Sequence, residues 1–343
     1  MVTISLCMIV KDEEAVLARC LDSIKDLMDE IIIVDTGSSD RTREIALDYT
    51  DQVYDFAWTG SFADARNFSF SKATKEYIYC ADADEVVDEE NRERFRVLKQ
   101  TLLPEIEIVQ MYYCNQLKFN TVYNFDKEYR PKLYKRLREF VWEEPVHEAV
   151  RLEPIVYDSD VEILHLPQGE HSGRDLAVFE RMASQEVHIS KRLHNLYARE
   201  LFVAGSESDF LHAVPAFVKT MNETDRSTDE LLEAECVLCH AARQKGDDVM
   251  FFQYAMKGIA GEGCSELCYE LGEFYHAKGN DEEAIIWYYN AAYETKPVLN
   301  LRYGGDYPLK KLAECYRAMD RADLAKDYET EAENWIQENL PEG

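Results

Sequence analysis

The N-terminal quarter of the chain alternates continuous apolar runs with segments whose apolar residues recur every three or four positions. The runs have the length of strands buried on both faces, and the recurring segments have the period of amphipathic helices. We expect strands at residues 3–10, 30–35, 52–56 and 76–85, and helices at 14–27, 40–49 and 62–72. This alternation predicts a parallel sheet that helices cover on both faces.

From residue 89 onward the pattern changes twice. A helical segment at 91–102 precedes β-rich pieces at 107–113, 129–134, 146–152 and 161–166, which complete the first domain. After residue 174 the chain consists of helical segments and short polar turns. We therefore predict an α/β domain at 1–170 and an all-α domain at 171–343.

The helical part contains an internal repeat of small and large residues. The clearest copy consists of Leu271-Gly272, Tyr275, Gly279-Asn280, Ala284, Tyr288, Ala291 and Pro297. Weaker copies begin near residues 197, 239 and 312. The spacing is that of tetratricopeptide repeats, each of which is a pair of antiparallel helices. Stacked repeats of this kind bury a continuous core and form a concave binding surface.

Composition narrows the class of protein. A chain of 343 residues with 46% hydrophobic and 31% charged residues is typical of a globular protein. The formal net charge of -29 argues against nucleic acid and anionic membranes as partners, because binding either one draws on clustered Lys and Arg. No apolar run reaches the length of a membrane span.

The 9 cysteines lie mostly within apolar segments. An odd count and this placement are typical of reduced core thiols, so we expect a cytoplasmic protein. Cys236 and Cys239 form a CxxC pair, but neither a second such pair nor a histidine pair at metal-binding spacing follows. Core packing is therefore favoured over a zinc or redox role for this pair.

Polar residues follow three of the predicted strands, at 11–13, 35–37 and 82–85. Open parallel sheets bind their ligands at the carboxyl ends of the strands. The first turn lacks a glycine-rich phosphate loop, which argues against a dinucleotide. In an extended chain Asp82 and Asp84 share a face, where two carboxylates suit Mg²⁺ or Mn²⁺. Glu85 would then point across the pleat and be structural.

Three segments carry a resemblance to a known family: Ile31-Ile-Ile-Val-Asp-Thr-Gly-Ser-Ser-Asp-Arg-Thr42, Phe62-Ala-Asp-Ala-Arg-Asn67 and Asp82-Ala-Asp-Glu85. In order and spacing they resemble family 2 glycosyltransferases, which are nucleotide-sugar enzymes of the Rossmann-like GT-A fold. The repeat region resembles that of the subgroup containing the sublancin-type peptide S-glycosyltransferases. The resemblance implies an α/β GT-A domain followed by an all-α, tetratricopeptide-like helical repeat domain.

The resemblance also implies a role for each matching position. Glu13 and Asp35 would bind the ribose and the uracil edge, Arg66 would lie close to the nucleotide, Asp82 near the ribose and Asp84 on the metal. The other implied nucleotide contacts are Val10, Thr36, Gly37 and Ala83. Two simpler alternatives stay open: Asp35 caps the following turn, and Arg66 is a surface residue or a structural ion-pair partner.

The candidate residues for binding and activating the sugar acceptor lie at 142–148, Trp-Glu-Glu-Pro-Val-His-Glu. This segment resembles a Val-His-Glu element of such transferases. An inverting transfer needs a general base to take the acceptor's proton. Glu148 is favoured, with His147 and Glu144 as the other candidates. Glu144 and Glu148 share a face only if Pro145 does not break the strand.

Two further features lie in the second half of the α/β domain. His165 is, by resemblance, a further metal ligand, and the alternative is a core histidine bonded to the backbone. The only basic run of the protein consists of Lys127, Arg130, Lys132, Lys135, Arg136 and Arg138. We interpret it as the solvated face of a hairpin in preference to a diphosphate site.

The resulting hypothesis is a metal-dependent, inverting hexosyltransferase. It would use Mg²⁺ or Mn²⁺ and a UDP-sugar donor, with a peptide, protein or glycan acceptor. The repeat domain would help to bind the acceptor or to form a homodimer. Two other classes compete. Residues 82–86 fit the nucleophile strand of haloacid-dehalogenase-like phosphatases, although that strand should come first in its sheet. A non-catalytic tetratricopeptide scaffold with a degenerate transferase domain is the second.

Overall fold

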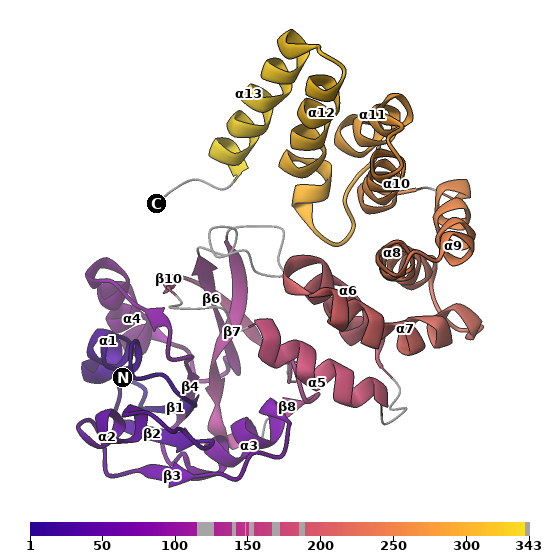
Figure 1. The fold of residues 1–343 in the computed structure, drawn as a ribbon. Helices are drawn as coiled ribbons and strands as arrows, with labels where there is room; N and C mark the ends of the chain where they lie inside the picture. Colours follow the sequence, from indigo (N-terminus) through magenta and orange to yellow (C-terminus); the bar gives the residue numbers. More distant parts are fainter. Residues whose placement is uncertain are drawn as a thin grey trace. The chain divides into compact units, whose positions relative to one another are not determined.

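The computed structural model describes residues 1–114, 127–138, 142–147, 149–150, 154–166, 172–184, 189–261 and 263–339. They form two compact units, one with the described residues up to Leu166 and the other with those from Ser172 onward (Figure 1). Each unit has its own core, and each is considered by itself.

Unit 1 is built around an 8-stranded sheet in the order β3-β2-β1-β4-β7-β6-β10-β5 (Figure 1). Its first strands are β1 (Ile4–Val10), β2 (Glu30–Asp35), β3 (Val53–Asp55) and β4 (Tyr77–Cys80). The others are β5 (Glu85–Val86), β6 (Ile108–Cys114), β7 (Glu128–Lys135) and β10 (Val156–His165). The predicted run of parallel strands is confirmed for β1 to β4.

The direction of the later strands decides which side chains meet. β7 is antiparallel to both β4 and β6, β10 is parallel to β6, and β5 is antiparallel to β10. Because β7 runs opposite to both of its neighbours, β6 and β10 run the same way as β1, β2 and β4. The carboxyl ends of β2, β4 and β10 therefore lie along one edge of the sheet, where ligands bind in open α/β folds.

Helices cover both faces of this sheet. They are α1 (Leu17–Ile24) with its 3-10 extension Lys25–Leu27, α2 (Thr42–Leu47), α3 (Phe62–Lys72) and α4 (Glu89–Thr101). Alternate residues of β1 point to opposite faces, so Leu6 and Met8 enter one core cluster and Cys7 enters the other. Phe95 of α4 packs in the first cluster and Phe70 of α3 in the second. The predicted layered arrangement is confirmed.

The β-rich piece predicted at 146–152 is confirmed only in part, at residues 149–150. A separate 2-stranded antiparallel hairpin joins β8 (Trp142–Glu143) to β9 (Ala149–Val150). Glu144 and His147, in the loop between them, have φ values of 69° and 46°. Such left-handed backbone cannot continue an extended strand, so the chain turns around Pro145. A second difference is smaller: the strand predicted at 161–166 begins earlier, at Val156.

Unit 2 is helical throughout its regular structure. Its helices are α5 (Ser172–Ser184), α6 (Lys191–Ala204), α7 (Glu207–Asn222), α8 (Thr228–Lys245), α9 (Asp248–Ala260), α10 (Ser265–Ala277), α11 (Asp281–Tyr289), α12 (Asp306–Ala318) and α13 (Ala322–Asn339). Short 3-10 segments lie at Arg136–Arg138 in unit 1 and Leu301–Gly304 in unit 2, and a π-helix at Asn290–Glu294 extends α11.

Several consecutive helices pack against each other, among them α7 with α8, α10 with α11 and α12 with α13, which is the arrangement that two-helix repeats require (Figure 1). The repeat residues explain the close packing of one pair. A Cβ added at Gly272 on α10 would lie 2.5 Å from ring atoms of Tyr288 on α11, so only glycine permits this approach. None of the helices in the described ranges combines the length and the hydropathy of a bilayer-crossing segment.

Unit 2 contains a buried acid whose titration we expect to control stability. Glu200 on α6 is 5% exposed, and burial together with the charge of Asp175 raises its pKa to about 8. Between the ordinary glutamate pKa and pH 8 the folded protein keeps a proton that the unfolded chain has released. Stability therefore falls as pH rises through this window.

The variant Glu200→Gln should remove this pH dependence. We expect its free energy of unfolding to exceed that of the wild type at pH 8 by about 2–4 kcal/mol, and the difference to shrink at pH 5. Urea denaturation followed by circular dichroism at both pH values measures it. Glu333→Gln, which changes an exposed glutamate on α13, is the control. An equal change in the free energy of unfolding between pH 5 and pH 8 in the wild type and in Glu200→Gln would contradict the expectation.

Candidate active site

The acidic segment after β4 is a turn. β4 ends at Cys80, and the backbone N–H of Glu85 donates to the carbonyl of Asp82 at 3.2 Å. The prediction that Asp82 and Asp84 share the face of an extended strand is therefore wrong, because successive side chains of a turn do not alternate. The chain re-enters the sheet at Glu85, which is paired with His165 of β10.

This pairing brings together two residues that lie far apart in the sequence. Oδ2 of Asp84 lies 3.2 Å from Nε2 of His165, and both side chains are 13% exposed. The ring of Tyr113, at the end of β6, packs 5.3 Å from the imidazole between centroids. A carboxylate oxygen and an imidazole nitrogen suit a cation such as Mn²⁺. The two predicted metal ligands are thus adjacent.

Asp82 faces two cationic side chains. Nη2 of Arg66 lies 2.8 Å from its Oδ1, and Nζ of Lys132 lies 4.0 Å from its Oδ2. Desolvation by the surrounding fold raises the pKa of Asp82, but Arg66 and then Lys132 outweigh it and hold that pKa well below its usual range. The carboxylate is therefore ionised at neutral pH. Its side chain keeps 39% exposure, which leaves it accessible to a ligand.

Glu85 belongs to the same cluster, which corrects the prediction that it points away from it. Its side chain is 2% exposed and forms an ion pair with Lys132, which is 7% exposed. Burial raises the pKa of Glu85 to about 8, and the charges of Asp82 and Asp84 add to the rise while Lys132 opposes it.

Lys132 also corrects the interpretation of the basic run as a solvated face. It is buried against the two acids, and its neighbour along the strand, Arg130, places its guanidinium 4.1 Å from the centre of the Tyr113 ring. Sequence reasoning missed the role of Lys132 because that role depends on β7 inserting beside β4. The one local signal was the two-residue spacing of Arg130 and Lys132, which is the period of a strand face.

Helix α3 holds Arg66 and fixes the β8–β9 hairpin. The Arg66 guanidinium lies 5.2 Å from the centre of the Trp142 ring. The adjacent Asn67 donates from Nδ2 to the Trp142 carbonyl at 2.9 Å, and the Trp142 N–H donates to Oδ1 of Asn67 at 2.7 Å. These two hydrogen bonds resemble those between paired strands. Helix α3 therefore links Arg66 to the hairpin. Arg66 is the ion-pair partner that one alternative described, and it lies within the site.

The turn after β2 is fixed by its own polar groups. Oδ1 of Asp35 accepts the N–H groups of Gly37 at 3.0 Å and Ser38 at 2.8 Å, and Gly37 has a φ of 108° that favours glycine. The N–H and the hydroxyl of Thr36 both donate to the carbonyl of Val10, at 3.0 and 3.2 Å. The turn-capping role of Asp35 is therefore present. Contact of Asp35, Thr36, Gly37 or Val10 with a nucleotide stays a prediction.

Two more predicted contacts flank the same edge. The N–H of Glu13 donates to Oγ1 of Thr42 at 2.6 Å, and its carbonyl accepts from Val16 and Leu17, which starts α1. Ala83 is 5% exposed and packs in the first core cluster. Any contact of Ala83 with a ligand would therefore involve its backbone.

The candidate bases lie in the hairpin loop. Val146 is fully buried, and the carbonyl of Pro145 accepts from the N–H of Phe62 at 2.9 Å, which anchors the loop at the start of α3. Glu144 and His147 are partly buried beside this anchor. Glu148 lies outside the described residues. The choice among the three bases stays a prediction.

The part of the chain that carries most of this site is similar to a known family. Residues 5–152 match the family described as Glycosyl transferase family 2. The match extends from β1 to β9 and includes every predicted site residue except His165. Together with the strand order, it confirms the predicted GT-A fold of unit 1.

The relatives differ in how much of the chain they cover. The glycosyltransferase SunS of Bacillus subtilis is 25% identical over 259 residues, which are 72% of this chain and 60% of that protein. A TPR repeat-containing protein of Synechococcus elongatus is 47% identical over 85 residues, which are 25% of this chain and 21% of that protein. This chain thus spans less than two thirds of the length of either relative.

Among solved structures, glucosyl-3-phosphoglycerate synthase from Mycobacterium tuberculosis, crystallised with Mg²⁺ and uridine diphosphate, aligns at 15% identity with a TM-score of 0.40. The alignment covers 55% of this chain and 81% of that one.

Proposed function

We propose that this chain, whose residues 5–152 form a family 2 glycosyltransferase domain, transfers a sugar from a UDP-sugar to a peptide, protein or glycan acceptor with the help of a divalent cation. The observation that carries the proposal is the meeting of Asp84 and His165 beside Asp82 at the carboxyl edge of the sheet. This is the edge at which open α/β sheets bind ligands. The chemistry needs a cation, positive charge near the diphosphate, and a base.

Asp84 and His165 would hold the cation. One oxygen and one nitrogen donor suit Mn²⁺ better than Mg²⁺, which prefers oxygen and would rely mainly on Asp84; either ion would fill its remaining positions with water and phosphate oxygens. Both side chains are mostly buried and hold each other in place. When bound, the cation supplies positive charge that stabilises the diphosphate as it departs.

The buried cations of the site support binding of an anionic donor. The whole chain carries a net charge of -29, which repels a diphosphate. Locally the balance is different, because Arg66 and Lys132 pair with Asp82 and Glu85 and offset their charges. A divalent cation held by Asp84 and His165 would then leave the site with a net positive charge next to the accessible oxygens of Asp82.

Polar contacts would orient the nucleotide. Asp82 is accessible and ionised, so it can accept a hydrogen bond from a ribose hydroxyl. The turn at Asp35–Gly37 is held rigid by its own bonds, which suits recognition of a flat base. Glu13 would complete the contacts to the ribose and the uracil edge. Rigid positioning of this kind reduces the entropy cost of binding.

The hairpin loop would provide the base. In an inverting transfer the acceptor atom attacks the sugar carbon, its proton passes to the base, and the bond to the diphosphate breaks. Glu148, His147 and Glu144 are the candidates, and the loop that carries two of them is anchored to α3, the helix that holds Arg66. Donor and acceptor groups would therefore be held by one helix.

Unit 2 would contribute to acceptor binding or to a homodimer. Stacked helical hairpins form extended surfaces that bind peptides and proteins. The relative with the widest coverage here is named a glycosyltransferase, and another is named a TPR repeat-containing protein. The combination supports a transferase that recognises a macromolecular acceptor.

The two competing classes fare differently. A phosphatase of the haloacid-dehalogenase type needs a nucleophile on the first strand of its sheet, whereas Asp82 follows β4 and is paired with Arg66 and Lys132. The scaffold alternative has no such objection. It predicts no binding of UDP.

A panel of nucleotide sugars tests the proposed activity. With Mn²⁺ present we expect slow hydrolysis of at least one UDP-sugar, read as released UDP, and loss of the release with a chelator. A glycosyltransferase without its acceptor commonly hydrolyses its sugar donor slowly, because water replaces the acceptor. Absence of release from every UDP-sugar, with and without candidate peptides, would contradict the proposal. Hydrolysis of simple phosphate esters without UDP dependence would favour the phosphatase.

A further inference from the structure

A second cluster of metal-binding side chains lies in unit 2, whereas the proposed active site belongs to unit 1. His276 is in the last turn of α10, Asp281 is the first residue of α11, and Cys315 is on α12. Nδ1 of His276 lies 2.6 Å from Oδ1 of Asp281 and 3.6 Å from Sγ of Cys315. The three ligand atoms all lie within 4.8 Å of one another.

The repeat geometry explains why these residues meet. Gly279 has a φ of 75° and its N–H donates to the carbonyl of His276, which makes a tight turn between α10 and α11. Cys315 belongs to the core cluster that packs α12 against α11, together with Ala284 and Tyr288. One ligand therefore comes from each of three successive helices.

We propose that His276, Asp281 and Cys315 bind one zinc ion that joins these three helices, with water in the fourth position. Imidazole nitrogen, carboxylate oxygen and thiolate sulfur are the three donor types that zinc accepts, usually in tetrahedral geometry. The side chains of His276 and Asp281 are 30% and 21% exposed, so an ion can enter from solvent. Cys315 is fully buried behind them.

Of the three pairs of ligand atoms, His276 and Cys315 already have the separation of a tetrahedral site, and His276 and Asp281 must move apart. Zinc bonds of about 2.05 Å to nitrogen and about 2.3 Å to sulfur at a tetrahedral angle place the two ligand atoms about 3.6 Å apart. The observed separation of His276 Nδ1 and Cys315 Sγ is 3.6 Å. The contact between His276 and Asp281 must lengthen by just under about 1 Å. Rotation of two partly exposed side chains permits this.

Charge and protons also favour a divalent cation here. Nδ1 of His276 carries either one proton or one lone pair, so it can form a good hydrogen bond with only one of Asp281 and Cys315. A cation, in contrast, accepts a lone pair from each ligand. Zinc binding would release one proton from the thiol of Cys315 to solvent, and the ion would neutralise one carboxylate and one thiolate.

Charged groups on the neighbouring surface are already paired. Lys311, which precedes Cys315 by one turn of α12, contacts Glu273 on α10 and Glu314 on its own helix. On the other side of the turn, Lys278 pairs with Asp248 of α9. Asp281 forms an ion pair with His276.

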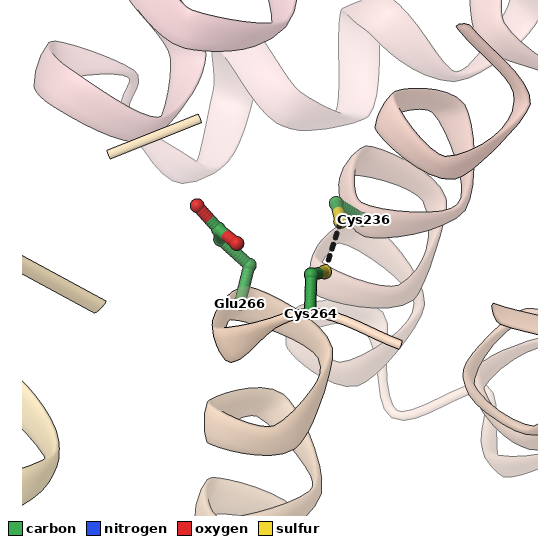
Figure 2. Close-up of side chains that lie close together, drawn as sticks. All are labelled: Cys236, Cys264 and Glu266. Carbon is green, nitrogen blue, oxygen red and sulfur yellow. Dashed lines mark hydrogen bonds between the residues drawn. The ribbon is translucent and has the colours of Figure 1, made fainter. Parts of the chain in front are cut away.

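A second sulfur cluster in unit 2 provides the contrast. Sγ of Cys236 on α8 lies 3.3 Å from Sγ of Cys264, which precedes α10, and Glu266 lies nearby (Figure 2). All three are fully buried, and Glu266 already accepts the N–H groups of residues 298, 299 and 300. Figure 2 shows its carboxylate directed away from the sulfur pair. This cluster lacks a free third ligand and an entry path.

Cobalt substitution in the full-length protein tests the proposal. Co²⁺ occupies zinc sites and gives an intense near-ultraviolet charge-transfer band only when a thiolate is a ligand. We expect one equivalent of Co²⁺ to produce this band, and one equivalent of Zn²⁺ to remove it. The proposed active site contains no sulfur ligand, so Co²⁺ bound there gives no such band. The result is therefore independent of the proposed transferase activity.

Two cysteine variants decide between the clusters. Cys315→Ser should abolish the band, whereas Cys264→Ser should retain it at one equivalent. A wild type without the band, or a band that survives Cys315→Ser and disappears in Cys264→Ser, would overturn the proposal. Asp281→Asn keeps the hydrogen-bond acceptor and a folded turn, and we expect at least about tenfold weaker Zn²⁺ binding. Unchanged Zn²⁺ affinity in this variant would equally overturn the proposal, whether or not Cys315→Ser folds.

Discussion

Replacement of Asp84 by asparagine is expected to abolish sugar transfer and UDP-sugar hydrolysis while leaving the protein folded. The amide keeps the size of the side chain and can still bond to His165, but it removes the charge that would hold the cation. Loss of one such electrostatic contribution typically costs about 10²–10³ in rate. Release of UDP from a UDP-sugar, compared at equal protein concentration, measures the loss.

The control for this experiment is Asp51→Asn, which changes an exposed aspartate between α2 and β3. It should retain the wild-type rate. Circular dichroism should show the same helix content in all three proteins. Full activity of Asp84→Asn would remove Asp84 from the proposed metal site.

Replacement of Lys132 by methionine is expected to destabilise unit 1 strongly. Lys132 is 7% exposed and faces both Glu85 and Asp82, so its removal leaves buried acids with less positive charge around them. Breaking a buried pair in this way costs about 3–5 kcal/mol. Urea denaturation at pH 7 measures the fall in the free energy of unfolding.

A double variant separates the charge effect from a packing effect. Adding Glu85→Gln removes the acid that Lys132 pairs with, so we expect Lys132→Met with Glu85→Gln to regain more than half of the lost stability. Lys135→Met, in the same strand but partly exposed, should cost less than about 1 kcal/mol. If the double variant were as unstable as Lys132→Met alone, the ion pair would not explain the loss.

Much of unit 1 follows from local sequence patterns. The strands β1, β2 and β4 are apolar runs, and α3 begins and ends at the predicted residues, Phe62 and Lys72. Ser61 caps α3 by accepting the N–H of Asp64, which is ordinary N-cap chemistry. Features that depend on neighbours in sequence were therefore predictable.

Features that depend on distant parts of the chain were not predictable in the same way. β7 lies between β4 and β6 in the opposite direction, and only this arrangement buries Lys132 against Glu85. The turn at Asp82 and the hairpin loop at Pro145 replace strands that the two-residue alternation favoured. His165 was suggested by family resemblance, and its contact with Asp84 depends on the pairing of β5 with β10.

Calorimetry of UDP binding with and without Mn²⁺ tests the central claim most directly, because it needs neither the sugar nor the acceptor to be known. The account predicts saturable binding of one UDP per chain in the presence of Mn²⁺, with binding weakened at least about tenfold when the cation is removed or when Asp84 is changed to asparagine. No binding of UDP with Mn²⁺, or equal binding without it, would contradict the account.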